Sequence, residues 1–102
     1  MEEEKVICSA IWYKELPHPV YGPINVDKGI VFCGLRHPHC LHQMVAMTGK
    51  RQSEVGEEIQ GFLTNKNRFV NRKEAAEIAL KSKQIEKLLY FKDQLDSSDL
   101  FK

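Results

Sequence analysis

The residues best suited to bind an anion are the cations of the segment 64–73. This segment holds no acidic residue and four cations, Lys66, Arg68, Arg72 and Lys73. Arg68 and Arg72 flank the expected start of a helix, where unpaired backbone N–H groups and the helix dipole already favour negative charge. A guanidinium offers a planar fork that holds a phosphate by two hydrogen bonds. The segment therefore indicates a local phosphate site, with a solvated basic turn as the alternative.

Two details help to decide between a phosphate site and a solvated turn. A cation in the first turn of a helix is unfavourable for stability, because the dipole is positive there. This local conflict at Arg72 favours a role in binding over a role in stability. Phe69 lies between the two arginines and could stack on a base. Strand alternation places Phe69 on the opposite face from Arg68 and Val70, which favours a core position instead.

A second candidate is the pair Arg36-His37, just before a helix that we expect to begin at Pro38. A histidine at the cap position can accept hydrogen bonds from backbone N–H groups, so a structural cap is one interpretation. Arg36 beside it is placed to reach a phosphate or to stack on adenine. The pair is therefore a second candidate anion site at a helix start.

Five ligand-type side chains within ten residues also raise the question of zinc: Cys33, His37, His39, Cys40 and His42. Their spacing argues against a metal site. Cys33 lies on an expected strand, and Cys40 faces away from the side of the helix that carries His39 and His42. No second ligand pair occurs elsewhere in the chain. We expect no bound metal and no cofactor.

Catalytic motifs are absent from the sequence. It contains no Gly-rich phosphate loop, no Gly-x-Ser-x-Gly elbow and no paired carboxylates at a turn. Histidines near arginines could support phosphodiester cleavage by acid–base catalysis, although nothing specifies their geometry. We expect binding without catalysis, with a hydrolase as the alternative. A third interpretation is an inhibitor of another protein that docks through its apolar C-terminal end.

The elements that position these residues are expected in the order β-β-α-β-β-α. Alternation and β-branched residues predict strands over 5–14, 29–33, 58–64 and 68–70. Helical spacing predicts one helix between Pro38 and Gly49 and a second that begins after Asn71. Asn71 with Glu74 three residues later forms a capping-box pattern, and the second helix could continue over 84–91. The fold class is therefore α+β: an antiparallel sheet of four strands with two helices.

The segment 5–14 alternates two largely apolar sets: Val6, Cys8, Ala10 and Trp12, and Ile7, Ser9, Ile11 and Tyr13. Because both faces are apolar, we expect a central strand that is covered on both sides. The segment 16–28 is rich in proline. It is either a lid over a pocket or a surface connection.

Length and composition limit the number of domains and the classes of partner. The 102 residues form a single domain, 1–102, with 42% hydrophobic and 28% charged residues. A net charge of +1 argues against a nucleic-acid polymer or an anionic membrane as partner. No apolar run approaches the roughly 18 residues of a membrane span. Three cysteines and no recognisable secretion signal predict free thiols in a reducing cytosol.

Several short motifs, taken in order, resemble the small phage proteins of the Thoeris anti-defence type 1 family. They are Cys33-Gly34-Leu35-Arg36-His37, Gln60-Gly61-Phe62-Leu63-Thr64, Arg68-Phe69-Val70-Asn71-Arg72, Glu74-Ala75-Ala76 and Ser98-Asp99-Leu100-Phe101. The resemblance covers residues 30–101 and rests on the order and spacing of these motifs.

The resemblance implies a sponge rather than a catalyst. Members of that family sequester a cyclic ADP-ribose isomer made by bacterial TIR-domain enzymes, and some also hold cyclic dinucleotides in a hexamer built from dimers. It further implies a homo-oligomer in the cytoplasm of the infected host. By resemblance, Arg68 and Arg72 match paired arginines that contact the nucleotide, and Arg36 matches the arginine before the first helix.

A ligand with two phosphates and an adenine needs fixed cations and planes on which the base can stack. The arginines at the two helix starts supply the cations, and aromatic residues such as Trp12 and Phe62 supply possible planes. A domain of this size can barely enclose such a ligand alone, which favours a pocket between protomers. The expected ligand-binding set is Arg68, Arg72, Arg36, His37, Asn71, Phe62, Thr64 and Trp12.

Overall fold

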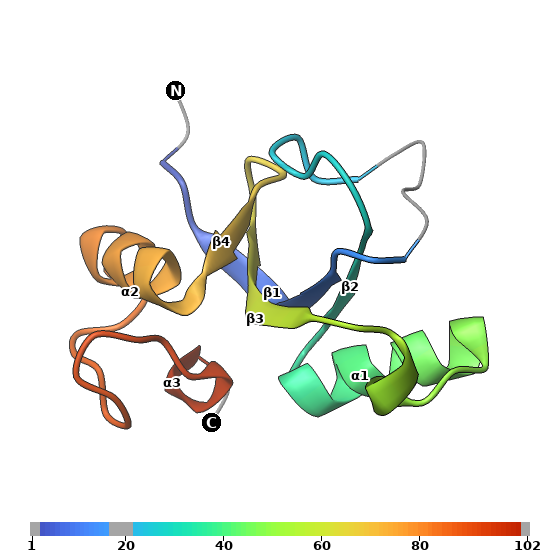
Figure 1. Ribbon diagram of the computed structural model, residues 1–102. Helices are drawn as coiled ribbons and strands as arrows, with labels where there is room; N and C mark the ends of the chain where they lie inside the picture. The colour runs from blue at the N-terminus through green and yellow to red at the C-terminus, as the bar shows by residue number, and fades with distance from the viewer. Residues whose placement is uncertain (1–2, 17–21, 101–102) are drawn as a thin grey trace.

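A single antiparallel sheet organises the chain (Figure 1). The computed structural model describes residues 3–16 and 22–100. The strands are β1 (Val6–Tyr13), β2 (Ile30–Gly34), β3 (Glu58–Thr64) and β4 (Phe69–Asn71), in the spatial order β2-β1-β3-β4. The helices of the described part are α1 (His37–Thr48), α2 (Arg72–Lys81), the short α3 (Ser97–Leu100) and one 3₁₀ turn (Gln52–Glu54). The α+β prediction and the central place of β1 are confirmed, and the short α3 is an addition to the two expected helices.

The helices lie on one side of the sheet, and the segment that precedes β2 lies on the other (Figure 1). The alternation predicted for β1 holds from Cys8 onward, with Ile11 and Tyr13 on the helix side and Ala10 on the other. A register shift between Val6 and Cys8 breaks the pattern at the start of the strand. This bulge turns Val6 into the cluster beneath α2, so the predicted face of Val6 is wrong.

Two separate clusters form the core on the helix side. Cys40 and Met44 of α1 pack with Ile11 and Tyr13 over the β1–β2 half of the sheet. On the other half, α2 packs against Phe62 and the rest of β3 and β4 through three buried alanines, Ala75, Ala76 and Ala79. Small side chains let α2 approach the sheet closely. The two helices therefore cover different halves and leave the middle of the sheet between them.

The start of α2 follows the predicted capping box. Asn71 Oδ1 accepts a hydrogen bond from the Glu74 N–H at 2.8 Å, and Glu74 Oε1 accepts one from the Asn71 N–H at 3.0 Å. The predicted helical continuation over 84–91 is wrong. The helix ends at Lys81, and Lys83 adopts a left-handed conformation with φ 63°.

The physical reason for that ending is a contact with the distant strand β1. Gln84 Oε1 accepts a hydrogen bond from the Val6 N–H at 2.7 Å, and Gln84 Nε2 donates one to the Val6 carbonyl at the same distance. The Gln84 amide thus satisfies the backbone groups of Val6, which lies beyond the residues of β1 that pair with β2. Further along, Leu95 is buried and Leu100 packs on the α2 cluster, so the segment 95–100 docks on this protein's own core.

The opposite face of the sheet is only partly covered. Val26, from the segment before β2, packs on Ala10 and Phe69. Asn25 holds this segment to β4 by exchanging two hydrogen bonds with the Phe69 backbone at 2.7 and 2.8 Å. The described part of the proline-rich segment therefore packs on this face, and its Gly22 and Pro23 line a small cavity there with Val31 and Leu63. That the segment acts as a lid or as a surface connection stays a prediction. Its residues 17–21 lie outside the described residues.

Candidate functional site

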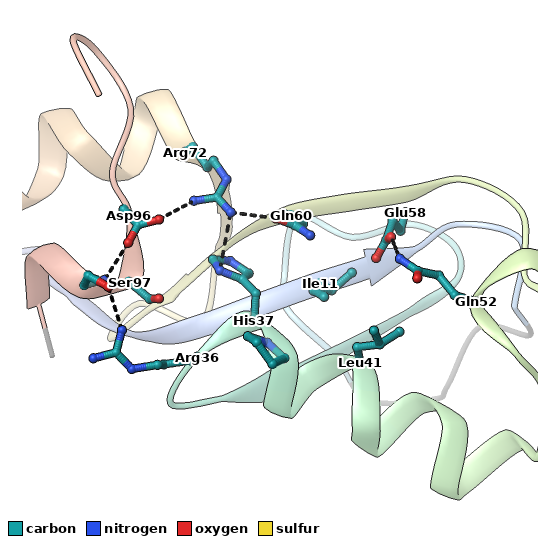
Figure 2. A pocket seen from close by; sticks show the side chains of 12 residues that line it. Ile11, Arg36, His37, Leu41, Gln52, Glu58, Gln60, Arg72, Asp96 and Ser97 are labelled. Carbon is teal, nitrogen blue, oxygen red and sulfur yellow. Dashed lines mark hydrogen bonds and ion pairs between the residues drawn. The ribbon is translucent and has the colours of Figure 1, made fainter. Parts of the chain in front are cut away.

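A cavity of about 460 Å³ opens on the helix side of the sheet, and we call it the α1–α2 cavity (Figure 2). Its volume falls in the range typical of small-molecule sites. Figure 2 shows Arg36, His37, Arg72 and Asp96 gathered at one end and Glu58 with Gln52 at the other. The lining residues are Ile11, Arg36, His37, Pro38, Leu41, Gln52, Glu58, Gln60, Arg72, Asp96, Ser97 and Ser98.

The fold explains why a polar cavity lies here. Glu58, Gln60 and Phe62 alternate along β3 and point to the same side of the sheet as the helices. Phe62 is buried under α2, but Glu58 and Gln60 reach the gap between the two helices. Both α1 and α2 begin at this gap, so their dipoles favour an anion inside it.

Arg72 is held in the cavity by several contacts. Its Nη1 donates to the Leu95 carbonyl at 3.0 Å, and its Nη2 donates to Gln60 Oε1 at 2.6 Å. The carboxylate of Asp96 lies 3.9 Å from Nη1. A cation is unfavourable at a helix start, but these contacts offset that cost, because Arg72 joins the C-terminal segment to β3 by hydrogen bonds. Arg72 therefore contributes to stability as well as to the charge of the cavity.

His37 orients that arginine. Its Nε2 lies 2.8 Å from the Gly61 carbonyl, so Nε2 must carry a proton and donate it. Nδ1 then bears a lone pair, which faces Arg72 Nη2 at 3.5 Å. Burial lowers the pKa of His37, and the Arg72 cation lowers it further, although the bond to Gly61 opposes this change. His37 is the first residue of α1 rather than its cap, which corrects the predicted start at Pro38.

Arg36 occupies the N-cap position of α1 and faces the same end of the cavity. Its Nη1 donates a hydrogen bond to Ser98 Oγ at 2.8 Å. Its backbone N–H donates to His39 Nδ1 at 3.2 Å, so His39, not His37, is the histidine that stabilises the start of the helix. Arg36 and Arg72 are thus brought together from two helix starts and are both held by the segment 95–98.

Among the described residues that line the opposite end of the cavity, Glu58 is the one with a charge. Glu58 accepts hydrogen bonds from the Gln52 amide and from the Tyr13 hydroxyl, the latter at 3.3 Å. Burial and the neighbouring carboxylate raise the pKa of Tyr13, which keeps its hydroxyl a donor. Ile11 and Leu41 lie between the two ends (Figure 2). The cavity can therefore hold an anionic group at one end and a group with hydrogen-bond donors at the other.

The structure does not bring Arg68 into this cavity. Arg68 Nε and Nη2 each donate to the Glu4 carboxylate at 2.8 Å, and Thr64 Oγ1 donates to the same carboxylate at 2.7 Å. The Arg68 fork lowers the pKa of Glu4 to about 2. Two predicted ligand residues, Arg68 and Thr64, thus hold Glu4 of the N-terminal segment onto the sheet, and neither lines the cavity that Arg72 lines.

The other predicted ligand residues take structural places. Asn71 caps α2, and Phe62 is fully buried with its ring edge-on to His37 at 5.2 Å between centroids. Trp12 lies on the opposite face of the sheet, where its ring contacts Phe69 and its Nε1 donates to the Lys28 carbonyl at 2.7 Å. Of the eight predicted residues, the cavity collects Arg36, His37 and Arg72.

The cysteine and histidine cluster disperses in the structure. His37 donates to Gly61, and Cys40 is buried with its thiol toward the Ser9 carbonyl. Burial raises the pKa of Cys40 to about 11. Residues 3–16 and 22–100 contain no group of three or more His, Cys, Asp or Glu side chains arranged to hold a metal ion. That the protein binds no zinc stays a prediction.

Sequence reasoning missed the residues that complete the cavity: Gln52, Glu58, Gln60, Asp96 and Ser98. The sequence of β3 contains one signal that could have found two of these residues. Glu58 and Gln60 share a face with the buried Phe62, and polar residues at core-facing positions of a central strand indicate a site. No local signal marks Asp96 or Ser98, because their places depend on the docking of the C-terminal segment.

A family model described as Phage T4 y16D protein matches residues 5–102. The match spans nearly the whole chain, so the chain belongs to this family. No curated protein and no solved structure matches it. Among the described helices, none is long and apolar enough to cross a membrane.

Proposed function

We propose that this member of the phage T4 y16D protein family binds a small phosphorylated nucleotide in the α1–α2 cavity and holds it without turnover. One observation carries the proposal: Arg36 and Arg72, far apart in sequence, converge on one cavity at the starts of two helices. Guanidinium groups and helix N-termini are the features that proteins use most often to bind phosphate. The apolar middle and the far end, with Glu58 and Gln52, would receive a nucleoside.

The resemblance to the Thoeris anti-defence type 1 family extends the proposal to a ligand. A cyclic ADP-ribose isomer carries two phosphates, an adenine and ribose hydroxyls, which suit a cavity with cations at one end and Glu58 and Gln52 at the other. Cyclic dinucleotides are a second ligand class under the same resemblance. The protein would act in the cytoplasm of the infected host by removing the signal from its receptor.

The environment of His37 favours storage over hydrolysis. A general base needs a nitrogen that can take a proton from the attacking group. In His37 one nitrogen donates to Gly61 and the other faces Arg72. The ring orients an arginine, and neither nitrogen is available to a water molecule while these contacts hold.

Assembly into a homo-oligomer forms part of the proposal. The face of the sheet opposite the helices carries a partly covered apolar group: Trp12, Val31, Cys33, Ile59 and Leu63. A second copy packed on this face would bury it, in line with the dimer-based hexamer that the resemblance implies. Light scattering at micromolar concentration should give a multiple of the 11.8 kDa chain mass. A monomer would contradict this part of the proposal.

The test of the function is a release experiment. The protein is incubated with a cyclic ADP-ribose isomer, freed of unbound ligand and heated, and the released nucleotide is identified by chromatography. Recovery of the intact isomer supports storage without turnover. Recovery of a hydrolysed product indicates the hydrolase instead, and recovery of no nucleotide contradicts nucleotide binding.

A further inference from the structure

An acidic residue lies among the cations of the α1–α2 cavity. The carboxylate of Asp96 faces the guanidinium of Arg72 at 3.9 Å, with Arg36 on the same side (Figure 2). Among the described lining residues, two arginines stand against two carboxylates, Asp96 and Glu58, so their formal charges cancel. A cavity built only to hold as much negative charge as possible would not carry a carboxylate beside its arginine.

The two oxygens of Asp96 have different roles. Oδ2 accepts a hydrogen bond from the Ser98 N–H at 2.9 Å, which is the contact of a helix cap. Oδ1 faces Arg72. Asparagine and serine cap helices equally well, so the cap alone does not require a charged residue. The charge of Asp96 instead faces Arg72 in the lining of the cavity, so an anion bound at Arg72 would lie close to it.

We infer that Asp96 determines specificity in this site by favouring nucleotides whose phosphates are internal to a ring or chain over nucleotides with a terminal phosphate. This inference rests on the proposed nucleotide binding. An internal phosphate carries one negative charge, whereas a terminal phosphate carries about 1.5 to 2 at pH 7. The additional charge of a terminal phosphate at Arg72 lies close to the Asp96 carboxylate and is repelled by it.

The size of the effect follows from Coulomb's law. A fraction of a unit charge a few ångströms from Asp96, in a partly solvated cavity, changes the affinity by about threefold to tenfold. The effect is selective, because a ligand with internal phosphates lacks the additional charge. Asp96 thus costs some affinity for every anion and costs more for those with terminal phosphates.

The variant Asp96→Asn tests the inference, because it removes the charge and keeps the cap. The probes are a cyclic ADP-ribose isomer, whose two phosphates are both internal, and ADP, whose outer phosphate is terminal. Calorimetric titration of both probes gives the ratio of their dissociation constants. We expect the wild type to prefer the cyclic probe, and the preference to shrink by about threefold to tenfold in Asp96→Asn.

The matched control is Asp93→Asn, which removes the same charge from an exposed position in the same segment, outside the residues that line the cavity. Asp96→Ser supplies a second neutral cap, and melting curves verify that each variant is folded. An unchanged ratio in both Asp96 variants, or an equal change in Asp93→Asn, would overturn the inference and leave nucleotide binding intact. A wild type that binds neither probe removes the proposed function, and this inference with it.

Discussion

Replacing Arg72 by alanine should weaken nucleotide binding much more than replacing Arg68. Among the described residues, three of the five N–H donors of Arg72 face acceptors, on Leu95, Gln60 and His37. The Nε–H and one Nη1–H have no hydrogen-bond acceptor among these residues, although Nη1 also lies 3.9 Å from the Asp96 carboxylate. We expect a phosphate in the cavity to accept from them. A charge-assisted hydrogen bond contributes about 1.5–3 kcal/mol, so its loss should weaken binding by roughly tenfold to a hundredfold.

Both substitutions should lower stability, which makes the pair a useful comparison. Arg72→Ala leaves the carbonyl of the fully buried Leu95 without its Arg72 donor and should cost about 1–3 kcal/mol. Arg68→Ala breaks the ion pair with Glu4, in which the Arg68 side chain is 36% exposed, and should cost about 1 kcal/mol or less. Because Arg72→Ala is expected to be the more destabilised of the two, the affinities are compared at a temperature at which the melting curves show both variants to be fully folded.

Calorimetric titration with a cyclic ADP-ribose isomer, beside thermal melting of each variant, measures both quantities. The expected pattern is reduced affinity in Arg72→Ala and near wild-type affinity in Arg68→Ala. Unchanged affinity in Arg72→Ala would refute the assignment of the cavity as the nucleotide site. A larger loss in Arg68→Ala would move the site to the basic turn that the sequence first indicates.

Three further predictions follow from the same contacts. The pKa of His37 is lowered in the folded state, so the unfolded chain binds a proton at a higher pH than the folded chain does. Melting temperatures should therefore fall as the pH drops below about 6.5. In a His37→Gln variant the melting temperature should depend less on pH between pH 7.5 and 5. Gly61→Ala should lose about 1–3 kcal/mol or more in urea unfolding, because its Cβ would overlap the Val70 carbonyl, and a loss below 0.5 kcal/mol would contradict that packing. Elemental analysis of protein purified without added metal should find no stoichiometric zinc, and one zinc per chain would reopen the cluster around Cys40.

Features of the fold that depend on neighbouring residues could be predicted from the sequence. The strand β3 and the capping box of Asn71 with Glu74 are both predicted from seven residues or fewer, and both are confirmed. The helix predicted over 84–91 is wrong because the Gln84 side chain binds the backbone of Val6, 78 residues away. Local helical propensity contains no information about such a partner.

The candidate site could be predicted only in part, because some of its features are local in sequence and others depend on packing. Arg36 and Arg72 stand out because each lies at a helix start, and this feature is local. Their meeting in one cavity depends on how α1, α2 and the segment 95–98 pack. Arg68 and Arg72 were expected to act together because they flank the start of a helix, but residues four apart share a face only when both lie within the helix. Arg68 precedes a strand, and its side chain binds Glu4 instead.

The location of the bound nucleotide tests the central claim most directly. Arginine side-chain Nε–H signals, assigned by substitution, can be followed by NMR during titration with a cyclic ADP-ribose isomer. The α1–α2 cavity predicts that the signals of Arg36 and Arg72 shift and saturate together, while that of Arg68 stays in place. A saturable shift of Arg68 alone, or no shift of either cavity arginine at saturating ligand, would contradict the account.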